Sequence, residues 1–190
     1  MAKREAFLAE IHACDPERLI FIDESGSHIA MTRTRAWAPK GRRAFGRVPR
    51  NRGRVTTMLA ALSIDGIEAM MTVQGGTTAP VFLKFLDEHL VPRLRSGDVV
   101  VMDNLGAHHA HGVRERIEAV GARVLYQPPY SPDLNPIELA WSKIKTALRA
   151  AGARTVEMLI AAIAFVVRFV TPRDAAGWFK HSGVFPPHPT

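Results

Sequence analysis

Two short runs of apolar residues dominate the hydrophobic pattern of the chain. Leu19–Ile22 and Val99–Met102 each consist of four consecutive apolar residues. A continuous run of this length is typical of a strand that is buried on both faces of a sheet. Both runs end abruptly at an aspartate, Asp23 after the first and Asp103 after the second. The pattern therefore predicts two interior strands, each followed by a carboxylate.

The rest of the pattern predicts an α/β domain. Val55–Ser63 and Ile67–Val73 flank Ile64-Asp65-Gly66, and Asp-Gly is a strong hairpin signal. Arg123–Gln127 is a further strand candidate, and helices are predicted over residues 77–94, 112–120, 136–151 and 155–169. After a lead-in over residues 1–17, the order is strand, hairpin, helix, strand, helix, strand, helix, helix. This order is typical of a mixed central sheet flanked by helices.

Composition restricts the class of protein. A chain of 190 residues suits one domain, and 47% hydrophobic with 23% charged residues excludes a disordered chain. The apolar run Met158–Val167 is too short to cross a bilayer as a helix, so we expect no membrane partner. We expect Met70, Met71 and Phe165 in the core. The single cysteine, Cys14, excludes an intrachain disulfide and fits a reducing compartment.

The charge is concentrated in one segment. The formal net charge is +7, and the segment from residue 33 to 54 holds nine basic residues, while no Asp or Glu occurs between Ser25 and Ile64. Repeated Pro and Gly make this basic insertion a loop or an irregular hairpin. A local patch of this kind indicates a polyanionic partner. We expect DNA contacts from Arg33, Arg35, Lys40, Arg42, Arg43, Arg47, Arg50, Arg52 and Arg54.

The two aspartates suggest a metal site. If the two apolar strands lie side by side and parallel, Asp23 and Asp103 project from the same sheet edge. Two like charges there repel each other, and a divalent cation would remove that conflict. Oxygen ligands favour Mg²⁺ or Mn²⁺. The alternative is that each aspartate only begins a turn, where Asp is common.

Glu138 is the third candidate carboxylate, and it too has an alternative role. Asn135 as N-cap, Pro136 at the first helical position and Glu138 at the third have the spacing of a capping box. A second ridge of the same helix carries Glu138, Ser142, Lys145 and Arg149, beside the apolar face formed by Ile137, Trp141, Ile144 and Leu148. A carboxylate followed by basic residues suits a metal beside a phosphate backbone, whereas a solvated helix face is the alternative.

A group of three histidines follows Asp103. His108, His109 and His111 do not have the spacing of a structural zinc site, and only one cysteine is present. We expect His108 to support the carboxylates or to transfer a proton. Glu24 and Asn104, each directly after one of the aspartates, are the other supporting candidates.

Three ordered motifs resemble a known family. They are Ile22-Asp23-Glu24-Ser25-Gly26, Met102–His108 and Tyr130–Glu138, with 34 residues between Asp103 and Glu138. Together they resemble the DDE superfamily endonuclease domain, and more narrowly the bacterial insertion-sequence transposases of the mariner superfamily. Trp37–Gly41 and Trp178–Gly183 resemble further segments of these enzymes, so that the resemblance covers residues 18–184 as a catalytic domain, before a tail over residues 185–190.

The resemblance implies a ribonuclease H-like fold with Asp23, Asp103 and Glu138 as catalytic and metal-binding residues. Two Mg²⁺ or Mn²⁺ ions, roughly 4 Å apart, would assist phosphodiester hydrolysis at the ends of a mobile element, followed by strand transfer into target DNA, usually at a TA dinucleotide. It also implies a homodimer on double-stranded DNA in the bacterial cytoplasm, near the nucleoid. Full-length relatives carry N-terminal helix-turn-helix modules. The chain is therefore compatible with a second reading frame, beside a separately encoded module, with a truncated copy, or with an expressed fragment, and activity of the isolated catalytic half stays open.

Two other functions are compatible with the residues. A ribonuclease H-like nuclease with a host role would cut RNA–DNA hybrids or branched DNA without strand transfer. A non-enzymatic basic protein would bind nucleic acid whether or not Mg²⁺ is present, with the acidic residues serving only as turn and helix caps.

Overall fold

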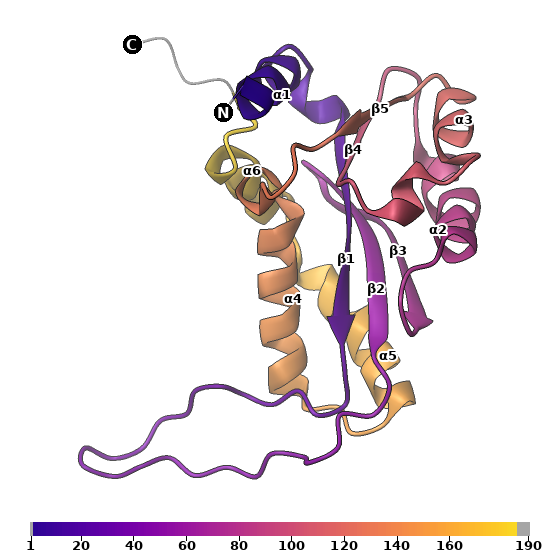
Figure 1. Ribbon diagram of the computed structural model, residues 1–190. Coiled ribbons are helices and arrows are strands. Elements are labelled where there is room, and N and C mark those ends of the chain that lie inside the picture. Colours follow the sequence, from indigo (N-terminus) through magenta and orange to yellow (C-terminus); the bar gives the residue numbers. More distant parts are fainter. Residues whose placement is uncertain (1, 186–190) are drawn as a thin grey trace.

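The fold is built on one mixed sheet. The computed structural model describes residues 2–185, and within them five strands pair in the order β3-β2-β1-β4-β5 (Figure 1). The antiparallel hairpin of β2 and β3 pairs with β1, whereas β4 and β5 continue the sheet in parallel to β1. The strands are β1 (Leu19–Ser27), β2 (Thr56–Ser63), β3 (Gly66–Gln74), β4 (Val99–Met102) and β5 (Arg123–Tyr126).

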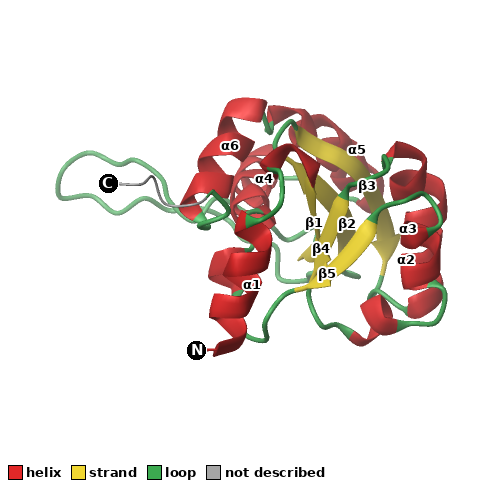
Figure 2. Cartoon of the chain, turned by 90° about the horizontal axis from the view of Figure 1, so that it is seen from above, coloured by secondary structure: helices red, strands yellow, loops and turns green. Residues whose placement is uncertain are grey.

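Helices cover both faces of this sheet (Figure 2). One face packs against α1 (Ala2–His12), α4 (Ile137–Ala151), α5 (Val156–Val166) and α6 (Pro172–His181). The other packs against α2 (Ala79–Phe85) and α3 (Val113–Glu118). Short 3₁₀ turns are η1 (Pro16–Arg18), η3 (Val91–Arg93), η4 (Gly106–His109), η5 (Pro132–Leu134) and η6 (Val167–Phe169), and η2 (Leu86–Leu90) is a π-helical turn. The predicted mixed sheet flanked by helices is confirmed.

The two apolar runs form the central strands because both of their faces are buried. Leu19 and Phe21 belong to the core on the α4 side, and Ile20 and Ile22 to the core on the α2 side. The residues of β4 alternate in the same way, with all four buried. This confirms the prediction drawn from their continuous apolar sequence.

The expectation that the first strand ends at Asp23 is wrong. β1 continues through Asp23 to Ser27, because β2 keeps pairing with it from Asp23 opposite Ala60 to Ser27 opposite Thr56. The pairing of β1 with β4 stops earlier, at Phe21 opposite Val101. Asp23 therefore lies inside a strand, which holds its backbone more firmly than a turn would.

Two helical predictions also need correction. The helix expected over residues 77–94 is regular only from Ala79 to Phe85 and then continues as a π turn and a 3₁₀ turn, where Pro92 lacks an N–H for helical pairing. Helix α6 was not predicted. Its signal is a capping box, in which Thr171 accepts from the backbone N–H of Asp174 and the Asp174 carboxylate accepts from that of Thr171.

The basic insertion forms an arm. Residues 28–55 contain no helix or strand, and the loop extends well away from the body of the molecule (Figure 1). Its side chains from residue 33 to 55 are exposed, with Pro49 half-buried. The predicted irregular loop is confirmed.

Other expectations had mixed outcomes. Met70 and Met71 are half-buried and pack against the two cores, whereas Phe165 is 61% exposed, so that its assignment to the core is wrong.

The lead-in contains α1, whose Phe7 and Ile11 are buried in the core. The expected tail lies outside the described residues except for Phe185. Among the helices of residues 2–185, none is long and apolar enough to cross a membrane.

Candidate active site

Asp23 and Asp103 come from neighbouring parallel strands. β1 and β4 pair with Leu19 opposite Val99 and Phe21 opposite Val101. Continued by two residues, this register leads Asp23 and Asp103 toward the same edge of the sheet, although β4 itself ends at Met102. The parallel sheet thus delivers both carboxylates to one edge, the place where α/β sheets form ligand sites.

Asp23 is held by α4. The indole N–H of Trp141 donates a hydrogen bond to Oδ2 of Asp23 over 2.9 Å, and Trp141 is 2% exposed. The pKa of Asp23 is raised to about 7, chiefly by burial and also by the Glu138 carboxylate, against the lowering effects of a backbone hydrogen bond and of the Trp141 donor. Ionised Asp23 is therefore a destabilised anion with one side-chain donor and a second carboxylate nearby. Trp141 was predicted only as part of an apolar face, although a buried indole N–H usually has a partner.

Glu138 does not cap its helix. α4 begins at Ile137 after Pro136, and no side chain forms a hydrogen bond to its N-terminal N–H groups. Asn135 is buried, and its Oδ1 has no partner within the described residues. The capping-box alternative is therefore wrong. The Glu138 residue is exposed on the first turn of α4, one turn before Trp141.

Asp103 is tied to a buried histidine. Nδ1 of His108 lies 2.7 Å from Oδ1 of Asp103 and 3.3 Å from its carbonyl oxygen. Nε2 lies 3.4 Å from Oε2 of Glu24, within ion-pair distance although the two atoms lack hydrogen-bond geometry. Burial alone lowers the pKa of His108, but the Asp103 and Glu24 carboxylates outweigh it and raise that pKa to about 9. The hydrogen bond from His108 in turn lowers the pKa of Asp103. His108 thus joins two expected site residues that come from different strands.

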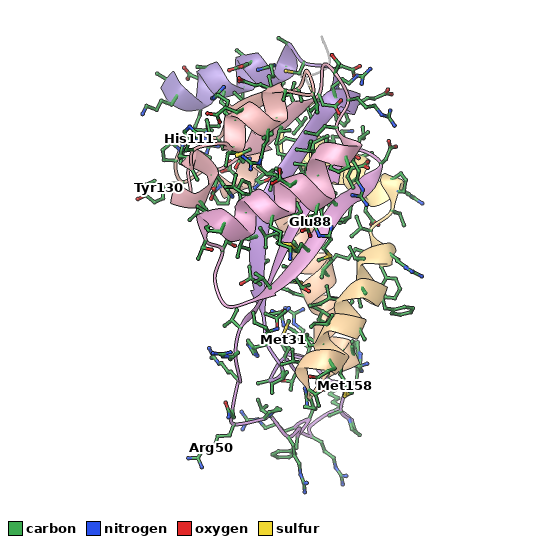
Figure 3. The ribbon with its side chains drawn as sticks, turned by 90° about the vertical axis from the view of Figure 1, so that its right-hand side faces the viewer. Met31, Arg50, Glu88, His111, Tyr130 and Met158 are labelled. Carbon is green, nitrogen blue, oxygen red and sulfur yellow. The ribbon has the colours of Figure 1, made fainter. Side chains whose placement is uncertain are left out.

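Asn104 connects the site to the loop that precedes α4. Its Nδ2 donates to the carbonyl oxygen of Gln127 over 2.6 Å, and its Oδ1 lies 3.3 Å from Nε2 of His109. The backbone N–H of Gln127 donates to Met102 over 2.9 Å. The loop from Gln127 to Pro136 is therefore anchored beside Asp103 at one end and leads into Glu138 at the other. Between these ends Tyr130 is fully exposed, at the edge of the molecule (Figure 3).

The donors suit a hard divalent cation, although they are not gathered around one point. Among residues 2–185, no three His, Cys, Asp or Glu side chains form a ready-made metal site. Asp23 turns toward α4, while Asp103 turns toward His108. Both offer carboxylate oxygens. The raised pKa of Asp23 means that its ionised form is destabilised, and a nearby cation would remove that cost. His109 stacks on Tyr126 and His111 is almost fully exposed, so neither adds to such a site.

Basic side chains of α4 and of the arm meet at the base of the arm. Arg149 lines one pocket together with Arg33 and Arg35, and a second together with Lys145 and His28. Burial lowers the pKa of His28, with further lowering by Arg52 and Arg149. The arm therefore leaves the sheet beside the basic ridge of α4. DNA contacts stay a prediction for all the basic residues named for that role, which are Arg33, Arg35, Lys40, Arg42, Arg43, Arg47, Arg50, Arg52, Arg54, Lys145 and Arg149.

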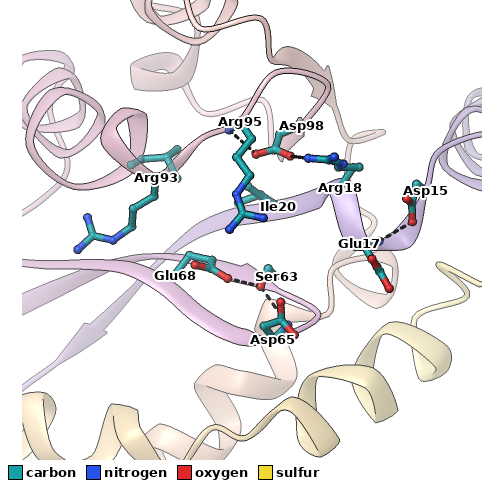
Figure 4. Close-up of a pocket in the computed structure, with 11 residues that line it drawn as sticks. Asp15, Glu17, Arg18, Ile20, Ser63, Asp65, Glu68, Arg93, Arg95 and Asp98 are labelled. Atoms are coloured by element: carbon teal, nitrogen blue, oxygen red, sulfur yellow. Dashed lines mark hydrogen bonds and ion pairs between the residues drawn. The ribbon is translucent and has the colours of Figure 1, made fainter.

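A separate pocket lies at the amino ends of β1 and β4 (Figure 4). Its most buried charged group, Asp98, accepts from the backbone N–H of Arg95 over 2.7 Å and pairs with Arg18. Across the pocket, the Ser63 hydroxyl donates to Glu68 over 2.6 Å. The pocket holds none of the candidate catalytic residues.

Comparisons with known proteins agree with this architecture. A family model described as DDE superfamily endonuclease matches residues 18–160. The pre-cleavage Mos1 transpososome aligns with a TM-score of 0.74 at 19% identity, over 96% of this chain and 58% of that chain. The Mos1 mariner paired end complex with Mn aligns with a TM-score of 0.74 at 18% identity, over 96% and 57%. The catalytic core domain of BIV integrase aligns with a TM-score of 0.53 at 15% identity, over 87% and 97%.

These likenesses confirm the predicted ribonuclease H-like fold. No curated protein sequence matches the chain. The chain spans just over half the length of the Mos1 transposase chains that it matches. At these identities the structures establish the fold, and the family model establishes the class of domain.

Proposed function

The chain belongs to the DDE superfamily endonucleases, and from this membership we propose that it is the catalytic domain of a DNA transposase. The observation that supports the proposal is the parallel pairing of β1 with β4, whose strands lead into Asp23 and Asp103. The Trp141 bond to Asp23 adds to it, because it ties α4 to β1 one turn after Glu138. We infer that these three carboxylates, from distant parts of the sequence, act together at this end of the sheet.

In this proposal Asp23, Asp103 and Glu138 hold two Mg²⁺ or Mn²⁺ ions. Bound there, the ions would lower the pKa of an attacking water and stabilise the departing 3′ oxygen of a phosphodiester. The protein's own part is positioning. Trp141 orients one oxygen of Asp23 and leaves the other available, and His108 does the same for Asp103. Water attacks the phosphorus and breaks its bond to the 3′ oxygen, which leaves a 3′-hydroxyl and a 5′-phosphate. That 3′-hydroxyl then attacks a phosphodiester of the target DNA, where the new phosphorus–oxygen bond replaces the bond to the target's 3′ oxygen, released as a hydroxyl.

The finer features of the proposal concern partners. The basic arm and the Lys145–Arg149 ridge would contact the phosphates of duplex DNA. The substrate would be the ends of a mobile element and a TA target, bound by a homodimer, with end recognition supplied by a helix-turn-helix module. The protein would act in the bacterial cytoplasm at the nucleoid. Alone, the chain should therefore bind duplex DNA with little sequence preference.

Cleavage and joining test the proposal. Purified chain is incubated with supercoiled plasmid and with a labelled duplex bearing a free 3′-hydroxyl, with Mg²⁺, with Mn²⁺, or with EDTA. We expect metal-dependent nicking and joining, reduced at least about 100-fold in Asp103→Asn and Glu138→Gln. Asp65→Asn, an exposed carboxylate at the β2–β3 turn, is the matched control and should retain full activity.

Other outcomes would refute the transposase assignment. Cleavage of an RNA–DNA hybrid or of branched DNA without any joining would identify a host nuclease. Equal DNA binding with and without Mg²⁺, and no cleavage of any substrate, would identify a non-enzymatic binding protein.

The DNA-binding role of the arm has a separate test. Replacing Arg42, Arg43 and Arg47 by alanine should flatten the slope of log K against log[salt] for duplex DNA by up to roughly 2–3, because each phosphate contact contributes about −0.9. All three side chains are exposed, so the unfolding free energy should change by no more than about 0.5 kcal/mol. An unchanged slope and affinity would mean that the arm does not bind DNA.

A further inference from the structure

The outer face of α5 is apolar but exposed. Leu159, Ile163 and Val166 point into the core, as expected for a helix packed on a sheet. On the opposite side, Met158 is 52% exposed, Ile160 40%, Phe165 61% and Phe169, in the following η6 turn, 43%. Ala161 and Ala164 are exposed between them. Contiguous exposed apolar surface of this kind is characteristic of interaction sites.

Helical spacing divides this face into three rows. Met158, Phe165 and Phe169 form one flank, where the rings of Phe165 and Phe169 pack edge to face with centroids 5.1 Å apart. Ile160 and Ala164 form the other flank. The middle row carries the only two charges, Glu157 at the start and Arg168 at the end, about three helical turns apart.

This arrangement is complementary to an inverted copy of itself. A two-fold axis that passes between Ala161 and Ala164, perpendicular to α5, sets Glu157 of each helix opposite Arg168 of the other. The same axis sets Met158 opposite the Phe165–Phe169 pair, a favourable sulfur–aromatic combination, and Ile160 opposite the small Ala164. A parallel arrangement would instead bring like charges together.

We propose that the outer face of α5 is an interface with a second copy of this chain, packed antiparallel around a two-fold axis. Such an isologous contact is the commonest symmetry of protein oligomers. From Val156 to Phe169 the helix is about 21 Å long, so that α5 alone buries less than the roughly 800 Å² per partner of a stable interface. The expected dimer is therefore weak and depends on concentration. Figure 3 places Met158 far from His111 and Tyr130, so this contact leaves the surface around those two residues open.

Sedimentation velocity of the full chain, without DNA or divalent cation, tests the proposal. Between about 5 and 500 μM the sedimentation coefficient should shift from that of a monomer to that of a dimer. Phe165→Glu adds one negative charge to each subunit. If the dimer forms on this face, two carboxylates enter the apolar contact, and the dissociation constant should rise at least about 30-fold. The substitution is at an exposed position, so circular dichroism should be unchanged. Tyr130→Asn, which alters an exposed aromatic residue elsewhere, should leave the dissociation constant unchanged.

Charge reversal tests the antiparallel geometry. Glu157→Arg alone, or Arg168→Glu alone, turns both cross-pairs into like-charge pairs and should raise the dissociation constant about tenfold. The double variant restores both pairs in inverted form and should return to within about threefold of wild type. Because each reversal also opposes the dipole of its own helix, thermal unfolding of every variant at low concentration separates a folding defect from a dimer defect.

Three results would overturn the proposal. They are a monomer at every concentration, a dimer that is insensitive to Phe165→Glu, and a double variant no better than the single reversals. The first would assign this face to another partner or to another part of a longer chain. None of these measurements uses nucleic acid or metal. The proposed function can therefore be refuted while this interface is supported, and the interface can be refuted while the proposed function is supported.

Discussion

Replacing Asp23 by asparagine keeps the shape of the side chain and an oxygen that can accept the indole N–H of Trp141, but it removes the ionisable group. The pKa of Asp23 in the fold is about 7, above its ordinary value of 3.8, chiefly because of burial. The protonated carboxyl group therefore stabilises the fold fully below pH 3.8, and that contribution is lost as the pH rises through about 7. At pH 8 the ionised group costs up to about 4 kcal/mol of unfolding free energy.

Urea unfolding at pH 5 and pH 8 without divalent cations measures this cost. We expect Asp23→Asn to be more stable than wild type at pH 8, by a margin that is reduced by more than half at pH 5. In a thermal melt, each 1 kcal/mol of unfolding free energy would correspond to a shift of about 2–4 °C in melting temperature for a chain of this size. Added Mg²⁺ at pH 8 should stabilise wild type but not Asp23→Asn, and Asp65→Asn should follow wild type throughout. Identical pH profiles for wild type and Asp23→Asn would refute the argument that ionised Asp23 is destabilised by its surroundings.

Three further substitutions give predictions of known sign. Trp141→Phe keeps a ring but removes the donor to Asp23, so urea unfolding should show a loss of about 1.5–3 kcal/mol at pH 8 and a smaller loss at pH 5; equal losses would contradict this. Asp174→Asn removes the carboxylate of the α6 capping box and the partner of Lys143, and should cost about 1 kcal/mol above pH 4. The Asp174 pKa of about 2 means that thermal melts at pH 2 should no longer distinguish this variant from wild type. Tyr130 has a left-handed φ of 55° and is fully exposed, so Tyr130→Asn should raise the melting temperature, and a lower one would show that its ring is packed.

Local sequence patterns predicted the elements whose signal is carried by their own residues. The apolar runs before Asp23 and Asp103 gave the central strands, and Asp65-Gly66 gave the hairpin. The extension of β1 to Ser27 could not be predicted in this way, because Asp-Glu-Ser-Gly resembles a turn and becomes a strand only through pairing with β2. Phe165 was misassigned for a related reason. Every position of α5 around it is apolar, so periodicity alone could not tell the inner face from the outer one.

The position of each candidate carboxylate along the chain was predictable, but the way in which it is held was not. Trp141 and Asp23 are 118 residues apart, and nothing near either of them in the sequence indicates a hydrogen bond. The Glu24–His108–Asp103 connection likewise joins residues that only the parallel pairing of β1 and β4 brings together. Long-range contacts of this kind depend on the assembled sheet.

Asp23 and Glu24 are adjacent in β1, so their side chains point to opposite faces of the sheet. One side chain is bound to α4 through Trp141, and the other lies against His108, which packs on Phe82 with ring centroids 4.4 Å apart. A single dipeptide therefore ties the site to both cores of the molecule. Because both cores are formed by fully buried strand and helix residues, they can hold the ionised Asp23 carboxylate in a place where it lowers the stability of the fold. In the proposed metal site, cation binding would gain the free energy that the buried charge otherwise costs.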